Sequence, residues 1–258
     1  MIKNILVVGS GKGGVGKSTV AINLSVALSK KKSTKVGLLD ADIYGPSIPQ
    51  MLGITNKPEM SKNKKILPYE KFGIKSMSIG NMLPKDSAVI WRGVMASNAI
   101  RQFLRDIEWG DLDFLVIDLP PGTGDIQLSL CQNLEISGSV LVSTPQEVSL
   151  IDVRKAINMF EKVNVPILGL IQNLSYLEIN KEKNYIFGKN GVLDEAKKRK
   201  LKILGDIPII PEISISCDRG IPETFEKKNH IYEIFQNISD NVIRALNQIE
   251  PKEVKIQT

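Results

Sequence analysis

Short apolar runs alternate with stretches of helical periodicity along most of the chain. The apolar runs are rich in β-branched residues and nearly continuous, which is typical of strands covered on both faces of a sheet. They fall at Ile5–Val8, Val36–Leu39, Phe114–Ile117, Val140–Val142 and Ile167–Ile171. Apolar residues at helical spacing lie between them, at Lys17–Lys31, Val94–Ile107, Ile126–Leu134 and Ser149–Val163. This alternation predicts an α/β fold: a doubly wound, mainly parallel sheet with helices on both faces.

The segments outside this alternation are predicted from their composition. Asn56–Lys75 is polar and rich in lysine, which favours a loop or a hairpin insertion. From Ile231 to Ile249 apolar residues recur at helical spacing, and the polar face lacks the basic bias of a membrane-binding helix. We therefore expect this helix to pack on the core. No linker or repeat divides the chain, so we expect one domain over residues 1–250 and a short tail at 251–258.

Composition narrows the class of protein. The chain has 258 residues, of which 42% are hydrophobic and 24% charged, as is ordinary for a globular protein. No apolar run approaches the length of a membrane span, and the first residues pass into a strand without a signal-peptide cleavage region. Two cysteines are too few for a disulfide framework. We therefore expect a cytoplasmic protein.

The net charge of +6 is spread along the chain. Its densest group, Lys197–Lys200, ends a predicted helix, where cations complement the helix dipole. The charge therefore predicts neither a nucleic acid nor a membrane surface as a partner.

A glycine-rich stretch, GSGKGGVGKST, fills residues 9–19 directly behind the first apolar run. Gly11, Gly16, Lys17 and Ser18 satisfy the pattern G-x-x-x-x-G-K-S of a phosphate-binding loop. In such a loop backbone N–H groups point at phosphate oxygens, the lysine meets the β- and γ-phosphates, and the hydroxyl ligates magnesium. The stretch predicts a P-loop NTPase that binds a nucleoside triphosphate with Mg²⁺.

Aspartates follow two of the predicted strands. Asp40 and Asp42 come at the end of the second strand and Asp118 at the end of the third. In a parallel sheet these ends lie on the edge where ligands bind. Asp118 can order the water shell of magnesium with Asp40 in support, and Asp42 can orient or deprotonate the attacking water. The sequence therefore predicts hydrolysis of the nucleotide as well as binding.

The same glycines allow an alternative. Gly11, Gly13 and Gly16 also satisfy G-x-G-x-x-G, with Asp40 as the acidic residue that a dinucleotide-binding fold places further along. That motif has no use for Lys17 or for the second acidic strand end. A nicotinamide-binding enzyme is therefore kept as an alternative hypothesis.

Lys12 is a second lysine at the start of the phosphate loop. The loop sequence KGGVGKST resembles that of the deviant Walker A group of dimeric ATPases, which includes partitioning ATPases, cell-division-site ATPases and iron–sulfur carriers. In that group the early lysine reaches the nucleotide of the other subunit. The resemblance implies that Lys12 acts in trans within an ATP-governed homodimer. The catalytic residues of a slow ATPase would then be Lys12, Lys17 and Asp42.

Within this group the chain is most similar to the Mrp-type iron–sulfur cluster carrier ATPases. The similarity is carried by Asp40–Gln50, Met77–Asn81, Trp91–Gly93, Asp118–Asp125, Thr144–Leu150 and Met159–Asn173. The resemblance implies adenine contacts at Asn173 and near Pro208, and a [4Fe–4S] cluster that is transferred to apoproteins. The nucleotide contacts expected in the loop are Gly11, Lys12, Gly13, Gly14, Val15, Gly16, Lys17, Ser18 and Thr19.

One feature departs from this family. Its members usually carry a C-x-x-C pair shortly after the strand that ends at Asn173, and two such pairs would supply four thiolates across a dimer. Here Leu174–Gly188 contains no cysteine. Cys131, in a predicted helix, and Cys217, in a predicted late loop, have no chelating spacing, and the single His230 has no Cys or His neighbour in sequence. No cluster ligand is therefore predicted within this chain.

Three functions follow from these observations. The first is an ATP-driven carrier that assists iron–sulfur assembly, with its cluster held by other thiols or by a partner. The second is an ATP-dependent positioning or partitioning switch without a cluster. The third is the nicotinamide-binding enzyme.

Overall fold

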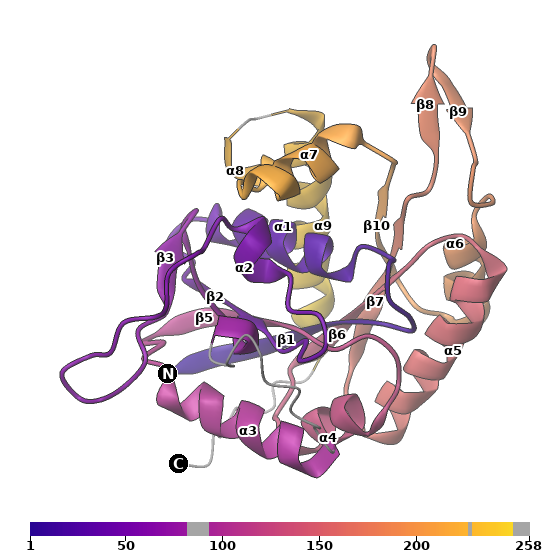
Figure 1. The fold of residues 1–258 in the computed structure, drawn as a ribbon. Helices are drawn as coiled ribbons and strands as arrows, with labels where there is room; N and C mark the ends of the chain where they lie inside the picture. The colour runs from indigo at the N-terminus through magenta and orange to yellow at the C-terminus, as the bar shows by residue number, and fades with distance from the viewer. Residues whose placement is uncertain (82–92, 227–228, 250–258) are drawn as a thin grey trace.

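The computed structural model describes residues 1–81, 93–226 and 229–249. Its main feature is an eight-stranded sheet in the order β10-β7-β6-β1-β5-β2-β4-β3, in which every pairing is parallel except that of β3 with β4 (Figure 1). The predicted doubly wound, mainly parallel α/β fold is confirmed. The strands are β1 Ile2–Ser10, β2 Val36–Asp40, β3 Tyr69–Lys71, β4 Ile74–Ser78, β5 Leu112–Asp118, β6 Gly138–Ser143, β7 Ile167–Asn173 and β10 Ile203–Ile207.

Helices cover both faces of this sheet (Figure 1). They are α1 Lys17–Ser29, α2 Ile48–Met51, α3 Gly93–Asp106, α4 Asp125–Asn133, α5 Glu147–Lys162, α6 Gly191–Arg199, α7 Pro211–Arg219, α8 Glu223–Glu226 and α9 His230–Leu246, with a 3-10 turn at Ile79–Asn81. The four helices predicted from periodicity are α1, α3, α4 and α5, each within two residues of its expected bounds.

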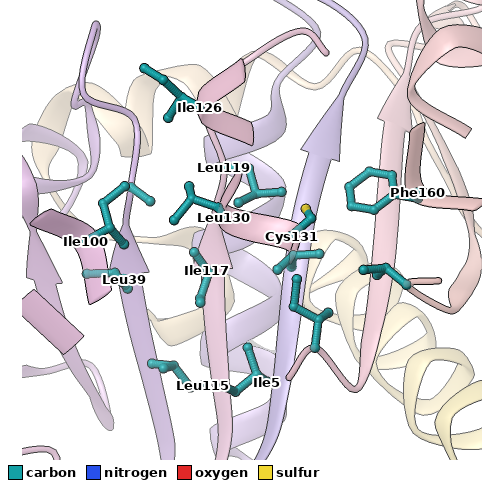
Figure 2. Packing of buried hydrophobic residues seen from close by; sticks show 14 of the residues in the cluster. Ile5, Leu39, Ile100, Leu115, Ile117, Leu119, Ile126, Leu130, Cys131 and Phe160 are labelled. Atoms are coloured by element: carbon teal, nitrogen blue, oxygen red, sulfur yellow. The ribbon is translucent and has the colours of Figure 1, made fainter. Parts of the chain in front are cut away.

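The core lies in two layers, one on each face of the sheet. On one face α1 and α9 cover the sheet, and Phe235 and Val242 of α9 are fully buried there. The final helix therefore packs on the core as predicted. On the other face α3, α4, α5 and α6 contribute buried residues such as Ile100, Leu130 and Phe160. Figure 2 shows part of this second layer, with the sulfur of Cys131 among its apolar side chains.

The register of the central strands brings the predicted site residues to one edge. Val8 of β1 lies opposite Asp118 of β5, and Asp118 in turn lies opposite Asp40 of β2. The phosphate loop leaves β1 two residues further on and leads directly into α1. A parallel sheet thus gathers side chains that are far apart in the sequence.

Several segments differ from the sequence-based expectation. The predicted insertion at Asn56–Lys75 does contain a hairpin, but its second strand, β4, is a full member of the sheet next to β2. Cys217 lies in α7 and not in a loop, because Pro211 at the first helical position and Gly220 in the left-handed conformation define a helix between them. Trp91 and Arg92 of the sequence blocks, and the predicted tail at 251–258, lie outside the described residues.

A second, two-stranded sheet was not predicted. It consists of β8 Leu177–Ile179 and β9 Glu182–Asn184, paired antiparallel. Figure 1 shows this hairpin projecting away from the main sheet, in the segment where the resemblance implies the C-x-x-C pair.

Candidate functional site

The phosphate loop is shaped by contacts that leave no room for side chains at two glycines. Gly16 has a φ of 84°, and a Cβ there would lie 2.2 Å from Nδ2 of Asn173. A Cβ on Gly11 would lie 2.2 Å from the backbone carbon of Asp152 in α5. Glycine alone meets both demands at Gly16. The loop therefore has β7 and α5 as fixed walls. Helix α1 starts at its end, where the first-turn N–H groups of a helix have no partner within the helix.

Lys17 is the cation at the base of the loop, with 6% of its side chain exposed. Its Nζ lies 2.7 Å from Oδ1 of Asp118 and 3.7 Å from Oδ2 of Asp42. It also lies 3.5 Å from Oγ of Ser18. Four predicted residues from three separate segments thus meet at one point. The Lys17 ammonium can exchange these carboxylate partners for phosphate oxygens, so that it has an anionic partner throughout.

Asp118 is fully buried at the end of β5. Burial raises the pKa of this carboxyl, while the Lys17 ammonium and the Ser18 hydroxyl oppose the rise. Within the described residues its second oxygen, Oδ2, is buried and accepts no hydrogen bond. An unsatisfied carboxylate oxygen next to a hydroxyl suits the water shell of magnesium, which needs few protein ligands when phosphates supply the rest. The residues present therefore fit the ion.

Asp40 fixes the loop that carries Asp42. Its carboxylate accepts hydrogen bonds from the backbone N–H of Asp42 at 3.1 Å, from the Ser78 hydroxyl at 3.0 Å and from the N–H of Ile48 at 3.2 Å. Burial and the nearby charge of Asp118 raise the pKa of Asp40 to about 7. Ile48 and Ser78 lie in the sequence blocks Asp40–Gln50 and Met77–Asn81, but those blocks do not show that the two residues bond Asp40, so the sequence did not reveal this anchoring role. The part of Asp40 in the magnesium shell stays a prediction.

Asp42 stands next to Lys17 at the mouth of the loop, 8% exposed. Its Oδ1 accepts from the backbone N–H groups of Tyr44 at 3.3 Å and Gly45 at 3.2 Å, which orients the carboxylate. Its Oδ2 faces the ammonium. This position suits a group that orients water beside a phosphate, and the assignment stays a prediction.

A cavity of about 280 Å³ opens beside the phosphate loop. Gly14, Gly16 and Thr19 line one side of it, and Asn173 and Pro208 line another. The amide Nδ2 of Asn173 donates to the carbonyl of Val15 at 2.8 Å, so this side chain is held against the loop. The remaining wall is largely apolar: Val20, Leu174, Ile207, Ile209, Ile210, Pro211, Ile213 and Phe235. Both predicted adenine-contacting residues thus line this largely apolar cavity, which is of the kind that takes a small-molecule ligand. Recognition of the base itself stays a prediction.

Lys12 and the two cysteines complete the predicted set. Lys12 is partly exposed at the start of the loop, and the structure gives its ammonium no hydrogen bond or ion pair within the described residues. Cys131 is 3% exposed, and burial raises the pKa of its thiol to about 12. Cys217 lines the cavity. In the described part of the chain, no three His, Cys, Asp or Glu side chains gather in a way that could hold a metal ion.

A strand, a glycine loop and a helix with a buried lysine and an aspartate from a neighbouring strand define the class of protein: a nucleotide-binding P-loop NTPase. A family model described as "ParA: NUBPL iron-transfer P-loop NTPase" matches residues 1–243. The chain belongs to this family. The nicotinamide alternative has no support in these findings.

Named relatives agree with this assignment. The chain is 46% identical over 251 residues to an "iron-sulfur protein required for NADH dehydrogenase, mitochondrial" of Arabidopsis thaliana, with 96% of the chain and 80% of that protein covered. It is 54% identical over 225 residues to an "iron-sulfur cluster carrier protein" of Aquifex aeolicus, covering 86% of the chain and 62% of the relative. The resemblance to iron–sulfur cluster carriers is therefore confirmed.

Solved structures match the fold. A nucleotide-binding protein from Archaeoglobus fulgidus in complex with ADP superposes with a TM-score of 0.77 at 39% identity, covering 91% of this chain and 92% of that one. The cell-division ATPase MinD of Pyrococcus furiosus gives a TM-score of 0.70 at 22% identity, covering 94% and 99%. The second likeness concerns the fold alone. Among the described residues, no helix combines the length and apolarity needed to cross a membrane.

Proposed function

We propose that this chain binds Mg-ATP, hydrolyses it slowly, and forms a homodimer that serves iron–sulfur cluster delivery to apoproteins in the cytoplasm. The observation that carries the proposal is the buried Lys17 ammonium between Asp118 and Asp42 beneath the phosphate loop. Catalysis of phosphoryl transfer consists mostly of positioning and of stabilising charge, and this cluster can supply both.

The residues divide this work. The backbone N–H groups of residues 13–17 would hold the phosphates, and Lys17 would move from Asp118 to the β- and γ-phosphate oxygens. Asp42, oriented by its backbone bonds, would hold the attacking water. Magnesium, held by Ser18 and through water by Asp118, would neutralise charge on the same phosphates when bound. Lys12 would add a second cation from the partner subunit.

Nucleotide binding is tested by calorimetry on Lys17→Ala. We expect it to lose measurable affinity for Mg-ATP, since the ammonium that neutralises the phosphates is gone. Lys32→Ala is a matched control, because Lys32 is an exposed lysine just beyond α1. Retained binding by Lys17→Ala would contradict the assignment of the loop.

The cluster needs a separate account, because the residues of this chain do not fit it. The segment Leu174–Gly188 has no thiol, Cys131 is enclosed in the core, and Cys217 faces the nucleotide cavity. Thiolates are the usual ligands of [4Fe–4S] clusters. We therefore propose that the cluster is cargo whose ligands belong to another protein, and that this chain supplies the ATP-driven step.

Anaerobic reconstitution tests this second part. Iron and acid-labile sulfide are quantified per chain after desalting, in parallel with ATP turnover. We expect a colourless, iron-free protein that still hydrolyses ATP. Stoichiometric iron and sulfide that disappear in Cys217→Ser would show instead that the chain holds the cluster with an unusual ligand.

A further inference from the structure

A cavity of about 560 Å³ lies at the edge of the sheet opposite the nucleotide site. It is lined by the first residues of β2 and β5, Val36 and Leu112, and by the turn between β3 and β4. These residues lie at the amino ends of parallel strands, whereas the phosphate loop and its aspartates follow the carboxyl ends. The cavity is therefore separate from the site described above.

Two phenylalanines form an aromatic pair at this cavity. Phe72 lines it, and its ring centroid lies 4.9 Å from that of Phe225 in α8, which is 41% exposed. Phe72 and Gly73 form the two-residue turn between β3 and β4, with φ of 54° and 78°. Asparagine and glycine are the usual residues of such a turn, and positive φ is uncommon for a bulky side chain. The turn thus presents an aromatic ring at a position that does not favour one.

Lysines surround the aromatic pair. Nζ of Lys30, directly after α1, lies 4.4 Å from the ring centroid of Phe225. Nζ of Lys71 lies 5.1 Å from the centroid of Phe72, and Lys35 lines the cavity beside them. Within the residues that the structure describes, none of these three lysines forms an ion pair. We call these five residues the basic-aromatic surface.

The cavity also contains two carboxylates, Glu70 and Asp111. Glu70 lies 3.6 Å from Nζ of Lys75, which donates to the carbonyl of Trp109 at 2.9 Å. A nucleic-acid backbone repeats the same negative charge along its length and would be repelled by these carboxylates. A peptide can place carboxylates on the lysines and its backbone N–H groups on Glu70 and Asp111. The mixed lining therefore favours an acidic peptide over a nucleic acid.

A second cavity, of about 420 Å³, adjoins the first. Both are lined by Lys35, Asp111 and Leu112, so they meet at these residues. The second cavity adds Lys3 and Asp113, whose charges are paired at 2.7 Å. Excess positive charge is thus concentrated at the first cavity, and the second extends the surface along the amino ends of the strands. This shape suits an extended segment better than a compact small molecule.

We propose that the basic-aromatic surface docks an acidic segment of another protein. Carboxylates of that segment would pair with Lys30, Lys35 and Lys71, and one of its apolar side chains would pack on Phe72 and Phe225. The proposal goes beyond the proposed function, because it requires neither ATP hydrolysis nor a cluster. Since the surface lies at the opposite edge of the sheet, the segment and a nucleotide can be bound at the same time.

Fluorescence anisotropy at low ionic strength tests this docking. The probe is a fluorescein-labelled peptide of glutamate and serine with one central leucine, and saturating Mg-ADP keeps the phosphate loop occupied. We expect the double variant Lys30→Glu, Lys35→Glu to bind it at least about tenfold more weakly than the wild type, because attraction becomes repulsion. Lys197→Glu, Lys198→Glu is the matched control: it changes the net charge equally on α6, which Figure 1 shows away from β3.

Each result bears on one part of the proposal. Equal weakening in both double variants, or equal binding of a peptide with glutamine in place of glutamate, overturns the docking of acidic groups at this surface. Equal binding of a peptide with serine in place of leucine overturns the aromatic contact. An oligothymidylate probe that binds the wild type more tightly than the peptide, and is lost in the Lys30→Glu, Lys35→Glu variant, overturns the choice of a peptide.

A charge swap adds a test that does not depend on loss of binding. The Lys30→Glu, Lys35→Glu variant is expected to bind a peptide of lysine and serine with one central leucine more tightly than the wild type does. This gain, together with an unchanged affinity for Mg-ADP, would show that the variant is folded. A lysine peptide that binds both proteins equally overturns the charge pairing at this surface.

Discussion

Gly16 shows how much one position in the phosphate loop has to satisfy. Its φ of 84° is costly for any residue with a side chain, and the space where a Cβ would stand is taken by the Asn173 amide at 2.2 Å. The same amide supports the loop through the carbonyl of Val15. The glycine of the motif therefore serves the packing of β7 as well as the approach of phosphate.

Gly16→Ala is expected to damage nucleotide binding more than stability. Strain in the left-handed region costs about 1–3 kcal/mol, and displacement of Asn173 adds to it. Calorimetry should show an ATP affinity at least about tenfold lower than that of the wild type. Chemical denaturation should show that the unfolding free energy falls only by about 1–3 kcal/mol, the cost of the backbone strain. Gly73→Ala is the control, because Gly73 has a similar φ of 78° but lies in the turn between β3 and β4 and not in the phosphate loop. Equal affinity losses in both variants would contradict this account.

Substitution of Lys12 is predicted to affect ATP turnover without affecting ATP binding. Its ammonium has no partner within the described residues, so Lys12→Ala should leave the loop and ATP affinity intact. Hydrolysis should fall to near background, because the cation supplied to the other subunit is missing. Mixing Lys12→Ala with an Asp42→Ala variant tests action in trans: partial recovery of turnover is expected, and no recovery would argue for action within one subunit.

The helices and strands differ in how clearly the sequence pattern predicts them. Central strands such as β1 and β5 are continuous apolar runs, because helices cover both of their faces. β4 escaped prediction because Lys75, Ser76 and Ser78 interrupt its run, and one of these serines is needed to bond Asp40. The β8–β9 hairpin escaped prediction because its strands have three residues each and face water. The phosphate-loop motif located the site, whereas the hydrogen bonds by which Ile48 and Ser78 hold Asp40 follow from the fold and not from any spacing in the sequence.

The pairing of α5 with α6 depends on one buried carboxylate. Glu195 of α6 is 4% exposed and binds Nε of Arg154 at 2.8 Å and Nε of Arg199 at 2.7 Å. Burial would raise the pKa of Glu195, but the two guanidinium groups outweigh it and the pKa falls below 4.5. The network therefore joins the two helices through Arg154 of α5 and Glu195 of α6.

Glu195→Gln is expected to lower the unfolding free energy at pH 7 by about 1.5–3 kcal/mol, the range for hydrogen bonds to charged groups. Because the folded pKa lies below the unfolded one, the stabilisation is complete above about pH 4.5 and is lost as the pH falls through the folded value. Urea unfolding should therefore show the gap between variant and wild type closing in acid. The exposed Glu161→Gln on α5 is the control; a gap independent of pH would exclude the ion pairs as its cause.

On the scale of the whole molecule, the nucleotide is expected to act as a stabiliser. The phosphate loop is held by β7, α5 and α1, so ligand binding is coupled to most of the fold. Mg-ATP at a hundred times its Kd should add about 2.7 kcal/mol, which corresponds to a rise in Tm of roughly 5–10 °C for a chain of this size. Thermal unfolding of wild type and Lys17→Ala checks this: a rise in the variant would mean that ATP binds elsewhere.

The central place of β1 in the sheet has a consequence for the newborn chain. β1 is the first strand to leave the ribosome, but Val8 needs β5 on one side and Val140 of β6 on the other. At about 5–20 residues per second, translation takes on the order of ten seconds to deliver both neighbours. The Asn173 amide that supports the loop follows only later. A nascent chain that ends before β6 therefore exposes the apolar strand β1 to aggregation or to chaperone binding. Its phosphate loop still lacks the support of Asn173, so ATP binding does not yet stabilise the chain.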